Sequence, residues 1–107
     1  MAAVLDEGLF DQLADRTLHK LERSLNEIDG LEADLESGIL TVEFPDGLRF
    51  VINSHRAARQ IWMAAVSSAW HFDPADDGSW RAARTGEALR PTLARLVHDR
   101  IGVSVAL

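Results

Sequence analysis

Apolar positions near the start of the chain recur at steps of three and four, the spacing of an amphipathic helix. The repeating positions are Phe10, Leu13, Thr17, Leu21, Leu25 and Ile28. The pattern predicts a helix over about residues 6–27, with Gly30 as a natural end signal. A second helix is predicted after Gly86, because Leu89, Leu93, Leu96, Val97 and Ile101 share one face. Pro91 fits this helix only in its first turn, and Gly102 is a suitable C-cap.

Between these helices the period changes to two, as in half-buried β-strands. The segments are ADLE (33–36), ILTVEF (39–44), LRFVIN (48–53), QIWMAAV (60–66), AWHFD (69–73) and a short strand around Trp80. Turn residues separate the first three, and the polar loop SHRAAR (54–59) precedes the fourth. We therefore expect one α+β domain over residues 1–107, a two-layer α-β sandwich. Its antiparallel sheet has five to six strands, with the N- and C-terminal helices packed on one face.

The same alternation assigns side chains to the two faces of the sheet. Ile61 and Met63 are expected to point toward the helices, whereas Gln60 and Trp62 point away from them. A tryptophan on an open sheet face is a common hot spot for partner binding. The pattern leaves a second interpretation open, in which a neighbouring loop or the C-terminal tail covers the Trp62 ring.

Charge is distributed unevenly along the chain. Residues 1–36 contain ten acidic and three basic residues, a formal charge of −7, whereas the remainder carries +1. Such asymmetry disfavours nucleic acid as a partner and favours cations or a basic protein. No apolar run is long enough for a membrane helix. The N-terminal residues resemble neither a signal nor a transit peptide, so a cytoplasmic bacterial protein is expected.

The acids of the first predicted helix form a stripe. At helical steps the sequence places Asp11, Asp15, His19, Glu22, Asn26 and Asp29 on one side. Clustered carboxylates repel one another, and a hard cation relieves that repulsion. From composition alone, a solvated surface of an acidic protein is the simpler interpretation of this stripe.

Little in the sequence indicates an enzyme. There is no cysteine, so thiol chemistry and thiolate metal sites are excluded. The four histidines fall on four different predicted elements without metal-ligand spacing, and are expected to be ordinary surface residues. No serine nucleophile motif and no glycine-rich phosphate loop is present.

Several motifs nevertheless resemble one family at matching spacing. They are Val51-Ile52-Asn53, Gln60-Ile61-Trp62, His71-Phe72-Asp73, Trp80 and Gly86, embedded in the element order described above. Together they resemble the frataxin family over nearly the whole chain.

The resemblance implies a weakly bound iron ion, Fe²⁺ or Fe³⁺, on an acidic ridge of the first helix and first strand. By position the ridge comprises Glu22, Glu27, Asp29, Glu32 and Asp34. The resemblance also implies that Asn53, Gln60 and Trp62 form a partner-contact patch. The implied partner is a cysteine desulfurase of iron–sulfur cluster assembly, with the scaffold protein as a second candidate. A monomer is expected in the absence of iron.

Two positions depart from the family pattern within the ridge. Asn26 and Arg23 stand where acids are usual, which predicts fewer or weaker ion sites. Two alternatives to a non-catalytic regulator stay open. The same carboxylates would promote Fe²⁺ oxidation in a ferroxidase or iron-storage protein, and a plain interaction domain would have no metal role.

Overall fold

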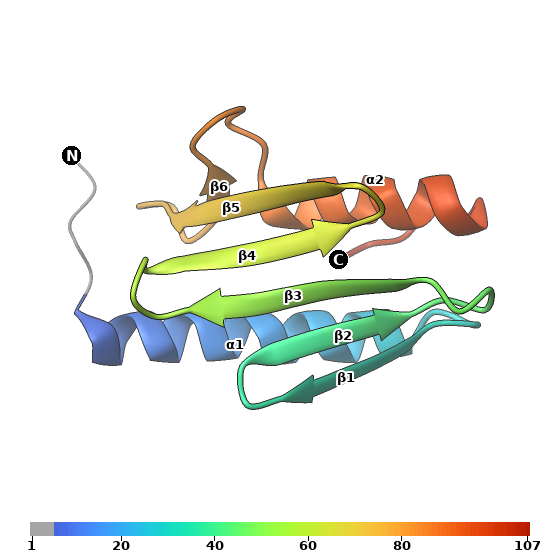
Figure 1. Cartoon of the computed structure of the whole chain (residues 1–107), viewed down its shortest axis with the longest axis horizontal. Coiled ribbons are helices and arrows are strands. Elements are labelled where there is room, and N and C mark those ends of the chain that lie inside the picture. The colour runs from blue at the N-terminus through green and yellow to red at the C-terminus, as the bar shows by residue number, and fades with distance from the viewer. Residues whose placement is uncertain (1–5) are drawn as a thin grey trace.

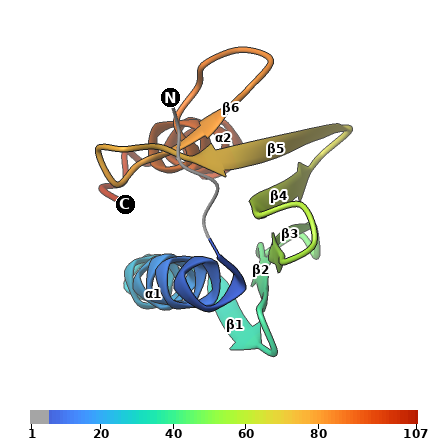
Figure 2. The same ribbon diagram turned by 90° about the vertical axis from the view of Figure 1, so that its left-hand side faces the viewer.

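The computed structural model describes residues 6–107, in which two helices cover one face of a six-stranded antiparallel sheet. The elements are α1 (Glu7–Asn26), β1 (Glu32–Glu36), β2 (Ile39–Glu43), β3 (Arg49–His55), β4 (Gln60–Ala65), β5 (Ser68–Pro74), β6 (Trp80–Ala82) and α2 (Leu89–Ile101). The strands follow one another in chain order across the sheet (Figure 1). Figure 2 shows α1 and α2 on the same side of the sheet. The predicted fold class is confirmed.

The helix ends follow from local hydrogen bonding. Asp6 caps α1, because its Oδ1 accepts the backbone N–H of Leu9 at 2.7 Å. The helix ends at Asn26, four residues before the predicted end signal Gly30, which instead adopts a φ of 91° in the turn to β1. α2 begins at Leu89, so Pro91 lies in its first turn as required. Gly102 is its left-handed C-cap, as expected.

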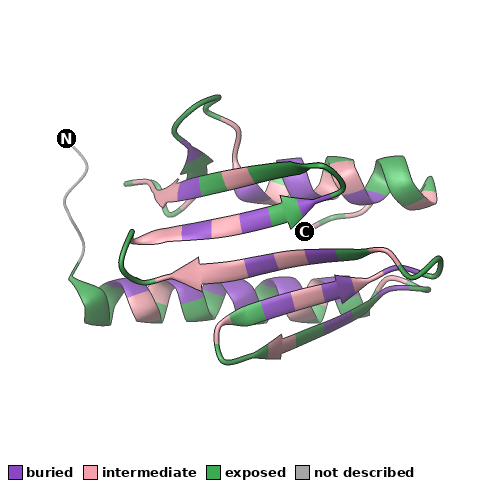
Figure 3. Cartoon of the chain, viewed as in Figure 1, coloured by how far each residue is buried: buried purple, intermediate pink, exposed green. Residues whose placement is uncertain are grey.

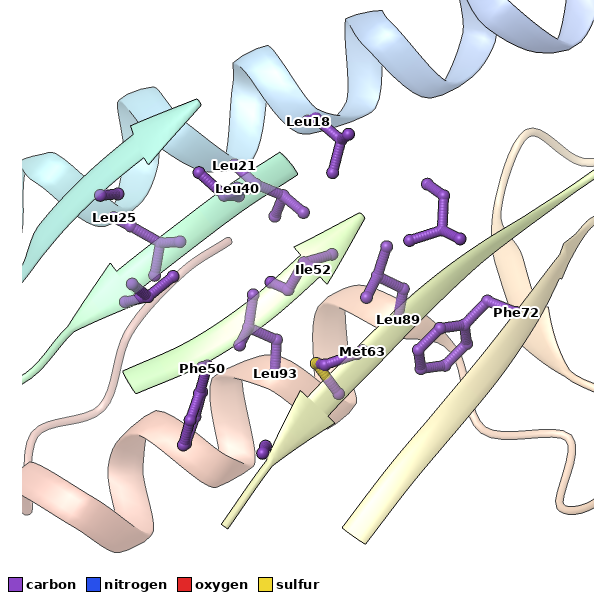
Figure 4. Packing of buried hydrophobic residues seen from close by; sticks show 14 of the residues in the cluster. Leu18, Leu21, Leu25, Leu40, Phe50, Ile52, Met63, Phe72, Leu89 and Leu93 are labelled. Carbon is purple, nitrogen blue, oxygen red and sulfur yellow. The ribbon is translucent and has the colours of Figure 1, made fainter. Parts of the chain in front are cut away.

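The core fills the space between the helices and the inner sheet face, as the labelled side chains in Figure 4 show. Leu18, Leu21 and Leu25 of α1 meet Leu40, Phe50, Ile52, Met63 and Phe72 of the strands and Leu89 and Leu93 of α2. Val105 and Leu107 of the C-terminal tail pack against this core from the gap between the helices. The tail therefore covers the helix side of the core, and not the outer sheet face.

Burial alternates along the strands as predicted (Figure 3). Ile61 and Met63 are buried, whereas Gln60 and Trp62 point to the outer face. The predicted end of the third strand was wrong: β3 continues through Ser54 and His55, which were expected to lie in a loop. Neither helix of residues 6–107 combines the length and apolar character needed to cross a membrane.

Candidate functional site: an acidic ridge and an aromatic patch

Four of the five predicted ridge carboxylates are exposed and lie close along the chain. Glu27 and Asp29 occupy the turn after α1, and Glu32 and Asp34 lie on β1. Within residues 6–107 none of them forms an ion pair. Six other carboxylates of the described residues pair with arginines, among them Asp11 with Arg56, Asp46 with Arg100 and Glu87 with Arg95. The negative charge of this edge is therefore left uncompensated.

The strand geometry extends this charge onto the outer sheet face. Glu32 and Asp34 are two residues apart, so they share one face of β1, while Ala33 between them is buried. Glu32 lies directly opposite Glu43 of β2, and like charges in that position repel. Arg49 of β3 approaches Glu43 at 3.7 Å and offsets part of this repulsion.

The ridge offers no closed coordination shell. Over the part of the chain that the structure describes, no three carboxylate or imidazole side chains converge closely enough to hold a metal ion. Hard cations such as Ca²⁺ require six or more oxygen ligands, so an ion here would keep much of its hydration. The geometry suits electrostatic attraction of a hydrated cation or of a basic protein surface.

Glu22 differs from the other four ridge carboxylates. Its Oε2 accepts the backbone N–H of Leu35 at 2.7 Å. One turn further along α1, the Asn26 side chain makes two hydrogen bonds to Ala33: its Nδ2 donates to the carbonyl at 2.9 Å and its Oδ1 accepts the N–H at 2.8 Å. The two side chains thus occupy the free edge of β1, which would otherwise expose unpaired backbone groups.

This double contact explains an asparagine where the family resemblance implies an acid. Replacing Asn26 by aspartate removes the amide donor and places a carboxylate beside the Ala33 carbonyl. We expect N26D to lower the free energy of unfolding by about 1–2 kcal/mol, although it adds an acid to the ridge. Urea denaturation would measure this change. In the matched control S24D, at the half-buried neighbour Ser24, no such pair of hydrogen bonds is lost; equal stability of N26D and wild type would contradict the assigned role.

The predicted contact patch lies on the outer face of β3 and β4. In the sheet register Asn53 stands opposite Trp62, and His55 opposite Gln60. Trp62 Nε1 donates to Gln60 Oε1 at 2.8 Å, and Gln60 Nε2 donates to Asp73 Oδ1 at 2.9 Å. These bonds fix the orientation of the Gln60 amide and of the indole ring.

His55 and His71, which were expected to be ordinary surface residues, stack on Trp62. The His55 ring lies 3.9 Å from the indole centroid at 17° between planes, and the His71 ring lies 4.2 Å away at 11° on its other side. His55 Nδ1 accepts the N–H of Ala58 at 3.3 Å, which helps to orient the imidazole ring. The Trp62 ring is consequently half-buried between imidazoles. Among the described residues, the rings that stack on it belong to β3 and β5, so Trp62 is the centre of a three-ring stack.

The stack was detectable only through strand pairing. His55, Trp62 and His71 belong to β3, β4 and β5, and the register places Trp62 directly opposite His71. Their sequence separations do not indicate contact, but the alternation places all three on one face. A correct extension of β3 to His55 would have revealed the group.

Comparison with known proteins agrees with the fold. The family model described as a frataxin-like domain matches residues 3–103. The iron-sulfur cluster assembly protein CyaY of Ralstonia nicotianae is 38% identical over 108 residues, covering 96% of this chain and 95% of that protein. The CyaY protein of Thioalkalivibrio sulfidiphilus is 37% identical over 102 residues, covering 92% and 95%.

Solved structures give the same result. Frataxin from Psychromonas ingrahamii superposes with a TM-score of 0.87 at 25% identity, covering 94% of this chain and 96% of that chain. A trimeric yeast frataxin complexed with ferrous iron gives a TM-score of 0.67 at 28% identity, covering 96% and 92%. On the family match and the identity to these relatives, the chain belongs to the frataxin family.

Proposed function

We propose that this protein acts in iron–sulfur cluster assembly as a non-catalytic, iron-binding regulator that binds a cysteine desulfurase. The names of its relatives support the assembly role. The observation that carries the proposal is the set of exposed, unpaired carboxylates at Glu27, Asp29, Glu32 and Asp34. An uncompensated acidic edge attracts both iron ions and a basic partner surface.

The two surfaces have different parts in this proposal. The ridge, Glu22 included through its second carboxylate oxygen, supplies long-range attraction and oxygen ligands for weakly held iron. The patch of Asn53, Gln60 and Trp62 supplies short-range contact, because a preoriented tryptophan gains much when a partner desolvates it. The scaffold protein of cluster assembly is a second candidate for the patch.

Charge reversal of the ridge tests the proposal. In the variant E27K/D29K/D34K we expect binding of the desulfurase to weaken by about tenfold or more at low salt, because each position changes from attraction to repulsion. Iron binding should weaken in parallel. Isothermal titration calorimetry measures both. Since all three side chains are exposed, the fold is expected to persist, which circular dichroism would verify.

The control makes the same change in net charge elsewhere. D15K/D76K/D99K alters three exposed acids outside the ridge and should leave both affinities close to wild type. Equal weakening in the two variants would show that only net charge matters, and unchanged binding in E27K/D29K/D34K would remove the ridge from the function. The rate of Fe²⁺ oxidation with and without the protein separates the ferroxidase alternative, which requires acceleration.

A further inference from the structure

A small pocket on the helix side of the molecule is lined by basic side chains. It has a volume of about 200 Å³ and lies between α1, the start of α2 and the turn from β5 to β6. Arg16 and Lys20 of α1 and Arg90 of α2 line it, together with Thr17, Ser79 and Trp80. No carboxylate belongs to its lining. The pocket is too small for a drug-sized ligand and suits one compact group.

These three cations lie together in one pocket and are not neutralised there. Within residues 6–107 none of the three forms an ion pair or donates a side-chain hydrogen bond. The chain has 17 acidic and 11 Lys and Arg residues, so acids are in excess. Other arginines form ion pairs with these acids: Arg56 pairs with Asp11, and Arg100 with Asp46.

The local structure increases the electrostatic cost of this arrangement. Arg16 and Lys20 are four residues apart on one helix face, where like charges repel. Arg90 lies in the first turn of α2, near the positive end of the helix dipole. That helix has no acidic residue in its first turn, and Ala88 provides no side-chain cap. A bound anion would remove all of these unfavourable contributions together.

Acids near the pocket are occupied elsewhere. Asp77 Oδ1 accepts hydrogen bonds from the backbone N–H and the hydroxyl of Ser79, and its other oxygen approaches Arg81. These bonds lower the pKa of Asp77, so it stays ionised and bound to its turn. Trp80 Nε1 donates to Thr17 Oγ1 at 2.9 Å. The polar donors of the turn and of Trp80 are thus already used, and only the three cationic side chains remain available to a ligand.

We propose that this pocket binds a small oxyanion with at least two negative charges, carried by a phosphate group or by neighbouring carboxylates. Arg16 and Arg90 would each supply planar pairs of N–H donors, and Lys20 a point charge. The site lies on the helix side, away from the outer sheet face that carries Trp62, and does not depend on the function proposed above.

Nuclear magnetic resonance titration of the full ¹⁵N-labelled chain tests the site. The probes are inorganic phosphate in one series and citrate in another, each at constant ionic strength set with sodium chloride. We expect saturable shifts of the Trp80 indole N–H and of the Gly78 and Ser79 amides, with the Trp62 indole unaffected. Saturation by phosphate alone assigns a phosphate ligand, and saturation by citrate alone a polycarboxylate.

Variants decide whether the three cations carry the binding. R16Q/K20Q/R90Q should weaken it by about tenfold or more, since it removes every available donor. R23Q is the matched control, because Arg23 is another exposed, unpaired arginine of α1 that lies outside the pocket. R90Q alone, at a half-buried side chain, serves if the triple variant does not fold. Absence of saturable shifts with either probe, or equal affinity of R16Q/K20Q/R90Q and R23Q, would overturn the proposal.

Discussion

Replacing Trp80 by alanine is expected to lower the free energy of unfolding by about 3–5 kcal/mol, a large share of the 5–15 kcal/mol typical of a small domain. Trp80 is the first residue of β6, a strand of only three residues. The residue is 5% exposed, and its ring packs edge-to-face on Phe10 of α1, with centroids 5.9 Å apart. The substitution therefore leaves a cavity and removes a link between the last strand and the first helix. Urea denaturation of wild type and W80A measures the difference.

The conservative variant W80F separates packing from hydrogen bonding. It retains most of the buried ring and loses the bond from the indole N–H to Thr17 Oγ1. The Thr17 hydroxyl keeps its own bond to the Leu13 carbonyl at 2.9 Å, so no buried donor is orphaned. We expect W80F to cost about 1–2 kcal/mol. A cost of W80A no larger than that of W80F would show that Trp80 does not anchor β6.

The spacing of apolar residues predicted the fold because the helices and the sheet each bury one face against the other. Positions such as Phe10 and Leu21 on α1, and Val42 and Ile52 on the strands, are fully buried as their spacing indicates. A single-residue slip of register would have exposed every one of the strand positions. The strong alternation therefore determined both the strands and the face that each side chain occupies.

Boundaries were less predictable where tertiary contacts or unusual turns set them. α1 ends within a residue of its predicted end, but the bonds of Asn26 to Ala33 that tie this end to β1 form only once the strand is in place. The hairpin from β4 to β5 turns at Val66 with a φ of 56°, a left-handed conformation rare for a β-branched residue. No glycine, asparagine or proline marks this turn, and the sequence pattern extended the strand through Val66.

The candidate site, like the fold, was only partly predictable from the sequence. The family resemblance supplied the ridge residues between 27 and 34; charge counting alone placed the excess of acids only within residues 1–36. It did not distinguish Glu22, since the bond to the Leu35 N–H depends on the docking of α1 against β1. Nor did it find His55 and His71 beside Trp62, because their contact requires the pairing of three strands. Spacing along the sequence does not specify which residues of neighbouring strands lie opposite one another.

Replacing Trp62 by alanine is expected to weaken binding of the cysteine desulfurase by about 2 kcal/mol or more, roughly thirtyfold in Kd, if the patch is the contact proposed above. The indole is held between His55 and His71 and hydrogen-bonded to Gln60, so little conformational freedom is lost on binding. Calorimetry with W62A measures the loss, and a thermal melt confirms the fold. A64S, on the same strand and face, is the matched control and should bind as wild type does.

Salt dependence tells whether Trp62 and the acidic ridge act by different forces. Screening weakens interactions between exposed charges, with a Debye length of about 10 Å at 0.1 M salt and about 3 Å at 1 M. The loss in E27K/D29K/D34K should therefore shrink as salt rises, whereas the loss in W62A, which comes from desolvation and packing of an aromatic ring, should persist. If both losses shrink together, the contribution of Trp62 is indirect and acts through the charged edge. If neither changes with salt, the ridge contacts the partner by packing and not by charge. If the acidic ridge attracts the partner by charge and Trp62 docks by packing, only the loss in E27K/D29K/D34K depends on salt.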